Sequence, residues 1–113
     1  MARGGFPGIP GGNMQQLMRQ AQKMQQQMIQ LQEELDAREY EASSGGGMVH
    51  VKVNGKRELL ELTIKPEAVD PEDVEMLQDL VMAAVNEALR TGEETREKEM
   101  ARVGGAAGMG GLF

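Results

Sequence analysis

Few residues of this chain could carry out chemistry. Of its 113 residues none is cysteine and one is histidine, so the chain offers no thiolate nucleophile and no site of clustered Cys or His metal ligands. That histidine, His50, alternates with valines, which is typical of the solvent-facing side of a strand, and no second group completes a nucleophile–base pair. The sequence therefore predicts a protein that is not an enzyme and has no cofactor, metal ion or small-molecule substrate.

A cluster of carboxylates begins at Asp70 and could in principle bind a metal ion. A structural role explains it better, because Asp70 is suited to be a helix N-cap, with Pro71 at the first helical position and Asp73 completing a capping box. Val69 and Val74 have the spacing of a hydrophobic staple, and acidic side chains suit the positive end of a helix dipole. The cluster therefore predicts the start of a helix.

Glycine-rich segments enclose the part of the chain that we expect to fold. Residues 1–12 and 104–113 contain most of the 15 glycines, which predicts two flexible tails around a single domain at 13–103. The first segment lacks the GK[ST] ending of a phosphate-binding loop and the apolar core of a secretory signal. Because no apolar run is long enough to span a membrane, we expect a cytoplasmic protein without a membrane partner.

Residues 13–38 predict one long helix with Asn13 as its N-cap. Apolar side chains recur there at the seven-residue spacing of a coiled-coil seam, namely Met14, Leu17, Ala21, Met24, Met28, Leu31 and Leu35. At 1.5 Å per residue this helix is about 39 Å long, which exceeds the width of a small domain. Part of it must therefore project or pair with another helix.

The central part of the chain changes to the two-residue period of strands. Apolar and polar residues alternate over 49–53 and again over 60–64, on either side of an Asn54-Gly55 turn in which both residues tolerate a positive φ. Tyr40 and Ala42 indicate a shorter strand before them. The chain therefore predicts a three-stranded antiparallel meander with one apolar face.

A second long helix is expected to run from residue 70 to about 103, bent or loosened at Gly92. Its segment from Met76 to Leu89 is apolar nearly all round, so that one face can cover the sheet while another requires a second surface. This excess of apolar surface predicts a homodimer. The residues expected at its interface are Leu77, Leu80, Val81, Ala84, Val85 and Ala88.

The net charge of −6 argues against nucleic-acid binding through overall charge. The acidity is concentrated in residues 66–103, whereas the first half of the first helix contains the cations Arg19 and Lys23. Contacts to phosphate require local cations rather than a basic chain, and a dimer would present each small patch twice.

The order helix, meander, helix resembles that of the YbaB/EbfC family of bacterial nucleoid-associated proteins. Four segments of the sequence also resemble this family: MQQLMRQAQKMQQQMIQLQEEL, GGGMVHVKVNGKRELLELTIKPEAV, PEDVEMLQDLVMAAVNEALR and EETREKEMARV. The resemblance spans the folded region and implies an α+β, tweezer-like homodimer whose projecting helices bind double-stranded DNA in the nucleoid. It also implies low or degenerate sequence preference and a role in nucleoid organisation and gene expression. By position, it assigns DNA contacts to Arg19, Lys23, Arg96, Lys98 and Arg102.

A helical clasp for protein partners, similar to a chaperone, is the alternative function. Methionine-rich apolar stripes suit adaptable protein contacts, and the glutamine-rich first helix and overall acidity fit such a clasp slightly better than they fit a DNA-binding protein.

Overall fold

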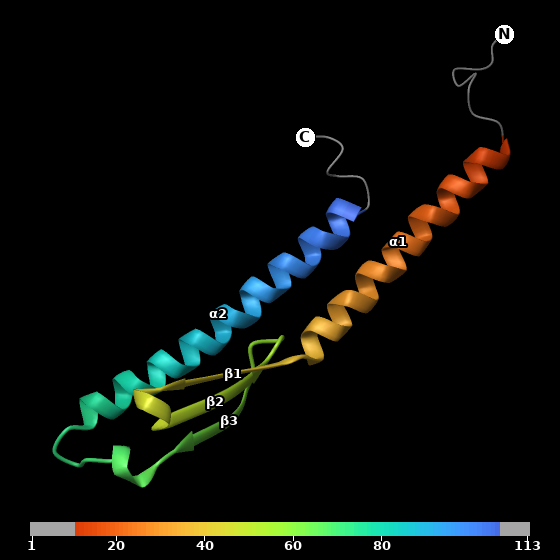
Figure 1. The fold of residues 1–113 in the computed structure, drawn as a ribbon. Helices are drawn as coiled ribbons and strands as arrows, with labels where there is room; N and C mark the ends of the chain where they lie inside the picture. The colour runs from red at the N-terminus through yellow and green to blue at the C-terminus, as the bar shows by residue number, and fades with distance from the viewer. Residues whose placement is uncertain (1–10, 107–113) are drawn as a thin grey trace.

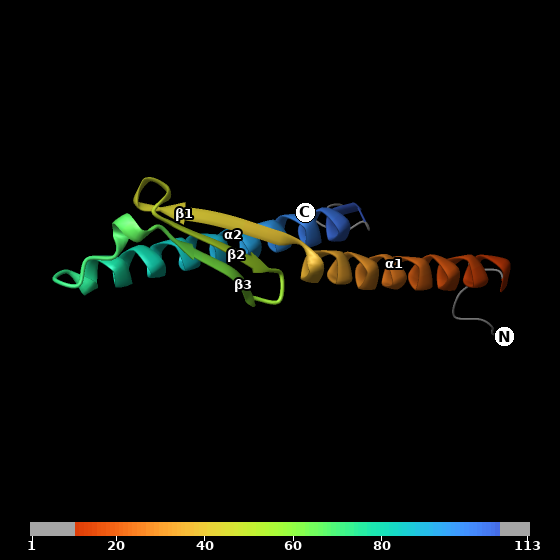
Figure 2. The ribbon, with the colours of Figure 1, turned by 90° about the horizontal axis from the view of Figure 1, so that it is seen from below.

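The computed structural model describes residues 11–106 as an elongated molecule with extents of 85 × 25 × 18 Å. Figures 1 and 2 show two long helices that leave a small sheet. The elements are α1 (Gly11–Ala37), β1 (Glu39–Ser44), β2 (Val49–Asn54), β3 (Leu59–Ile64) and α2 (Val74–Ala106), with short 3-10 turns at Gly45–Gly47 and Pro66–Ala68. The predicted α+β fold, with its helix–meander–helix order, is confirmed.

The core lies between the sheet and the first half of α2. The sheet is antiparallel with the order β1-β2-β3, and α2 packs across β1 and β2. Val49, Val51 and Val53 of the central strand are buried on the face that meets Ala84 and Ala88 of α2. Small alanines let the helix approach the valines closely, so one chain forms a thin but continuous core.

The edge strand β3 contributes little to this core. Leu59, Leu60 and Leu62 are between 43% and 48% exposed, and only Ile64 packs against the buried cluster. A register shift in the pairing of β2 with β3 places Leu59 opposite Val53 and leaves Leu60 with no residue directly opposite it on β2. The bulge interrupts the simple alternation that the sequence suggests.

Both helices begin at positions that differ from those predicted. Asn13 lies inside α1, which starts at Gly11. The Asp73 carboxylate accepts the N–H of Met76 at 3.2 Å and is the N-cap of α2, whereas Asp70 accepts the N–H of Glu72 in the preceding turn. The Asp70 cap is therefore wrong, because the chain makes one more turn before the helix begins.

Two further predictions about α2 depend on that starting point. Pro71 lies in the turn instead of at the first helical position, and Val69 and Val74 no longer have the N′ and N4 places that a staple requires. Both valines are about half exposed.

Gly92 does not interrupt α2, which is one continuous helix from Val74 to Ala106. A Cβ at this position would lie 3.1 Å from Cδ2 of Tyr40, so the glycine gives the buried tyrosine ring room against the helix. The predicted continuation of this helix past Gly92 is confirmed. Of the predicted tails, residues 11–12 and 104–106 are helical, and the remainder lies outside the described residues.

The loop between β2 and β3 is longer than the two-residue turn that Asn54-Gly55 predicts. The N–H of Arg57 donates to Asn54 O at 3.1 Å, and the N–H of Asn54 donates to Glu58 O at 3.0 Å. Residues 55–57 thus form a three-residue loop, and the left-handed residue is Arg57, with φ 66°. The Asn54 side chain stabilises the loop by accepting the N–H groups of Lys56 and Glu58.

Gly55 has another role, because it lets the hairpin touch the end of α1. A Cβ at Gly55 would overlap the carbonyl oxygen of Leu35, and the Gly55 N–H donates to Asp36 O at 3.2 Å. The Leu35 side chain is fully buried. Direct backbone contact between loop and helix therefore anchors α1 to the sheet.

We predict that Gly55→Ala lowers the free energy of unfolding by about 3 kcal/mol, because the added methyl group must separate the hairpin from α1. Gly46→Ala is the matched control: Gly46 has φ 66° but no neighbour within 4 Å, so only the backbone cost of about 1 kcal/mol applies. Urea unfolding at one protein concentration measures both variants. Equal losses would contradict the close-contact explanation.

Candidate nucleic-acid interface

The projecting half of α1 presents an exposed cationic patch. Arg19 and Lys23 lie one helical turn apart, and together with Gln16 and Gln20 they line a shallow hollow on one face of the helix. Neither cation forms an ion pair within the described part of the chain. Unpaired cations beside amide donors are the groups that contact phosphate oxygens in protein–DNA complexes.

The surroundings of this patch favour an anion. Residues 11–32 contain no Asp or Glu, and Arg19 and Lys23 are their only charged side chains. Residues 66–79, by contrast, carry six carboxylates and no basic side chain. Figure 1 places the start of α1 and the start of α2 at opposite ends of the molecule, so the acidic segment is remote from the patch.

The three predicted cations of α2 have different environments. Lys98 is exposed and has no ion-pair partner among the described residues. Arg102 donates to Glu99 at 2.6 Å, one turn away on the same helix. Such an exposed pair contributes at most a few tenths of a kcal/mol, so it leaves Arg102 available to a phosphate. Glu94 has the i,i+4 spacing for a helical ion pair with Lys98, but no such pair occurs in residues 11–106.

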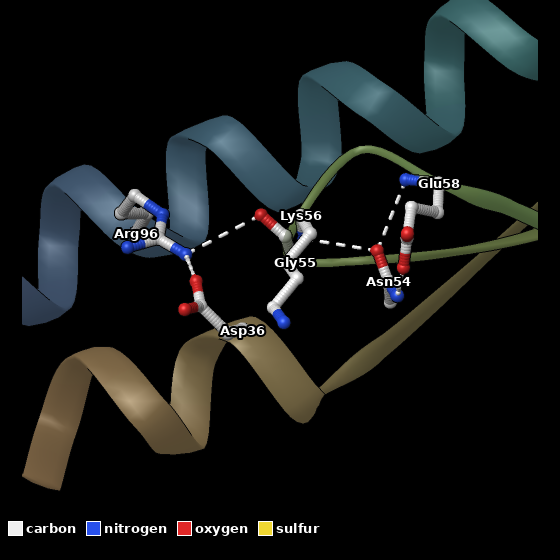
Figure 3. A network of polar contacts seen from close by, with 6 residues as sticks. All are labelled: Asp36, Asn54, Gly55, Lys56, Glu58 and Arg96. Carbon is white, nitrogen blue, oxygen red and sulfur yellow. Dashed lines mark hydrogen bonds and ion pairs between the residues drawn. The ribbon is translucent and has the colours of Figure 1, made fainter.

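Arg96 is engaged within the protein. Its Nη2 donates to Asp36 Oδ1 at 2.5 Å and to Gly55 O at 3.3 Å, and thereby joins α2 to α1 and to the hairpin (Figure 3). The side chains of Arg96 and Asp36 are about one-third exposed. The structure thus brings together Arg19 with Lys23, leaves Lys98 and Arg102 exposed, and assigns Arg96 to a junction.

The outer face of the sheet is polar and acidic. His50 lies there as predicted, and its Nε2 lies 2.7 Å from Glu41 Oε1, with Ser43 Oγ 2.9 Å from Nδ1. Lys52 lies 3.6 Å from Glu39 and 4.0 Å from Glu61. Carboxylates surround both basic side chains, so this face is unsuited to phosphate.

The residues predicted at a dimer interface are divided by the packing of α2. Ala84 and Ala88 are fully buried under the sheet of their own chain, which leaves them no surface for a partner. Leu77, Leu80, Val81 and Val85 are partly buried at the margin of the core. Sequence reasoning missed Leu59 as an exposed apolar residue, and the consecutive leucines before an alternating strand were the available signal.

Within residues 11–106, no helix is both long and apolar enough to cross a membrane. No group of three or more His, Cys, Asp or Glu side chains in this part of the chain is arranged to hold a metal ion.

Comparisons with known proteins agree with this geometry. The sequence profile of the YbaB/EbfC DNA-binding family matches residues 11–107. Nucleoid-associated proteins from Clostridium novyi (strain NT) and Clostridium perfringens (strain SM101 / Type A) are 57% and 58% identical, with 100% of each chain covered. The crystal structure of an uncharacterized protein from Helicobacter pylori matches with a TM-score of 0.64 and 30% identity, over 83% of this chain and 96% of that one.

The different environments predict different costs of removing the cations. The double variant Arg19→Ala/Lys23→Ala should change the free energy of unfolding by less than about 0.5 kcal/mol, because both side chains are exposed. Arg96→Ala should lower it by about 1 kcal/mol, the net value of a partly exposed, hydrogen-bonded ion pair. Urea unfolding tests both, and a double variant that loses as much as Arg96→Ala would contradict the assignment.

Proposed function

Because the chain belongs to the YbaB/EbfC DNA-binding family, we propose that it is a nucleoid-associated protein that binds double-stranded DNA as a homodimer through α1 and α2. The observation that carries this proposal is the pair of exposed cations, Arg19 and Lys23, on a projecting helix without acidic residues nearby. The matching profile belongs to a DNA-binding family, and the relatives named nucleoid-associated match over their full length.

In this proposal α1 carries the stronger phosphate contacts. Arg19 and Lys23 face no competing carboxylate on their helix, while Gln16 and Gln20 add neutral donors to the same face. Lys98 and Arg102 lie among acidic residues, so they contribute less attraction at long range. Because the proposed contacts are mainly to phosphate groups and not to base edges, we expect low or degenerate sequence preference.

The exposed leucines of β3 support the proposed dimer. Leu62 pairs with Val51 and so points to the face of the sheet that α2 covers, but α2 packs on β1 and β2 and leaves Leu62 exposed. Val81 and Val85 of α2, which pack against the same core, are partly exposed as well. An edge strand with exposed leucines is normally buried against another protein surface. A second copy of the chain would bury this surface and give two pairs of projecting helices.

A protein clasp is the second candidate function, and the distal seam of α1 favours it. Met14, Leu17 and Met18 are about half or more exposed, which is the type of adaptable apolar surface that protein partners use. Capture of specific proteins that remain bound after nuclease treatment, without a shift of any duplex at low salt, would favour the clasp over DNA binding.

We predict that the protein at micromolar concentration binds unrelated DNA duplexes at low salt and that its affinity falls steeply as the salt concentration increases. Arg19→Ala/Lys23→Ala should weaken binding and reduce the slope of log K against log salt by about 0.9 for each phosphate that is no longer neutralised. Fluorescence anisotropy over a salt series measures both quantities on several duplexes.

The matched control is Lys65→Ala/Arg90→Ala, which removes the same charge from exposed positions outside the distal half of α1. This control should reduce affinity only slightly. If the wild-type protein binds no duplex at low salt, DNA binding is refuted. If the two double variants lose the same affinity, the proposal that the α1 patch contacts DNA is refuted.

The dimer is tested separately from DNA. Light scattering should give about twice the chain mass of 12.3 kDa for the wild type. Leu62→Glu should shift the equilibrium to monomer because it places a charge in the proposed interface, whereas Thr63→Glu on the opposite face of β3 should leave the dimer intact. A wild-type monomer, or a Leu62→Glu dimer as stable as the control, would contradict this interface.

A further inference from the structure

The direction of α1 is set at its base. The apolar seam is 0% exposed at Leu35 and 9% at Leu31, but 52% at Leu17 and 49% at Met14. Intrachain packing therefore weakens along α1 toward the Arg19–Lys23 patch, with Met28 and Met24 only partly buried, and Figure 1 shows the distal half of α1 beyond the end of α2. Whatever fixes the orientation of this half must act through the contacts near Leu35.

Only one residue separates α1 from the sheet. The helix ends at Ala37 and β1 begins at Glu39, so rotation at Arg38 would change the direction of the whole helix. Besides the packing of the buried Leu31 and Leu35 side chains, two contacts oppose such rotation. The first is the backbone contact of Gly55 with Leu35 and Asp36, which holds the helix end against the hairpin.

The second contact is the polar network of Arg96. Its Nη2 donates both to the Asp36 carboxylate at 2.5 Å and to the Gly55 carbonyl at 3.3 Å, so one guanidinium spans three elements (Figure 3). Among the described residues, this is the only ion pair that joins α1 to α2. The network therefore opposes a change in the angle between the two projecting helices.

The length of α1 amplifies small changes at this network. Arg19 is 17 residues from Asp36, or about 25 Å along the helix. A rotation of 10° at the base would move Arg19 by about 4 Å, which exceeds the range of a hydrogen bond to a phosphate oxygen. The angle at the base thus decides whether cations on both helices can reach one duplex together.

We propose that Arg96 is a positioning residue, which with Asp36 and the Gly55 carbonyl sets the opening between α1 and α2, and does not itself bind phosphate. This assignment replaces the DNA contact that the family resemblance implies for Arg96. Its effect on DNA depends on the proposed function, whereas its effect on the opening between the helices does not.

The angle can be measured without DNA. The chain has no cysteine, so spin labels at Gln22→Cys on α1 and Ala101→Cys on α2 are unique, and dilution with unlabelled chains isolates the distance within one chain. Pulsed electron resonance should give a narrow distance distribution for the otherwise unchanged protein. Asp36→Asn and Arg96→Gln should each broaden or shift it.

Arg90→Gln is the matched control, because Arg90 pairs with Glu87 on α2 alone and should leave the distribution unchanged. Arg96→Lys keeps a positive charge beside Asp36 and should restore part of the narrow distribution. Identical distributions for the parent, Asp36→Asn and Arg96→Gln would overturn the proposal.

DNA binding supplies a second test that separates positioning from direct contact. Asp36→Asn leaves the Arg96 cation without its partner, so a phosphate contact by Arg96 would become stronger and the salt slope steeper. Positioning predicts the opposite, a loss of about tenfold in affinity for Asp36→Asn and for Arg96→Gln, with little further loss in the double variant. Stronger binding by Asp36→Asn would overturn the proposal.

The salt slope of Arg96→Gln distinguishes the same two roles, because removal of a phosphate-binding cation reduces the slope and impaired positioning alone does not. Should the wild-type protein bind no duplex, the proposed function fails, while the distance measurements still decide the role of Arg96. If the wild-type protein binds DNA normally but the variants show unaltered distances, the positioning role of Arg96 is rejected and the proposed function stands.

Discussion

The structure depends on the close approach of the β2–β3 hairpin to the last turn of α1. Gly55 meets the Leu35 carbonyl where no Cβ would fit, and its N–H donates to Asp36 O. This contact places Asp36 within reach of Arg96 and fixes the point from which α1 projects. Without it, the sheet and α2 would still form a core, but α1 would be joined to them only through Arg38 and a few side-chain contacts.

The sequence predicted the elements better than the contacts between them. Seven-residue and two-residue periods identify α1 and the strands because they depend only on which side chains need burial. The start of α2 was misplaced because Asp70 and Asp73 are both good caps, and the intervening turn decides between them. Gly55 appeared to be a turn residue, yet its role comes from a contact with residue 35, which no local pattern reveals.

The candidate site shows the same division. Arg19 and Lys23 could be identified from sequence because the absence of acidic residues around them is a local property. The state of Arg96 could not, since its partner Asp36 lies 60 positions away and is brought to it by the fold. Leu60 and Leu62 were predicted on the apolar face of the sheet, but a single helix covers only two strands, and the third remains open to a partner.

The separation of charge along the molecule has a consequence for its approach to any polyanion. The six carboxylates of residues 66–79 lie at one end, and the cations of α1 lie toward the other (Figure 1). The chain is thus a permanent electric dipole directed along its longest axis. The electric field around a polyanion exerts a torque on this dipole that turns α1 toward the polyanion and the acidic end away from it. The orientation of the chain is therefore selected before contact, although its net negative charge is repelled.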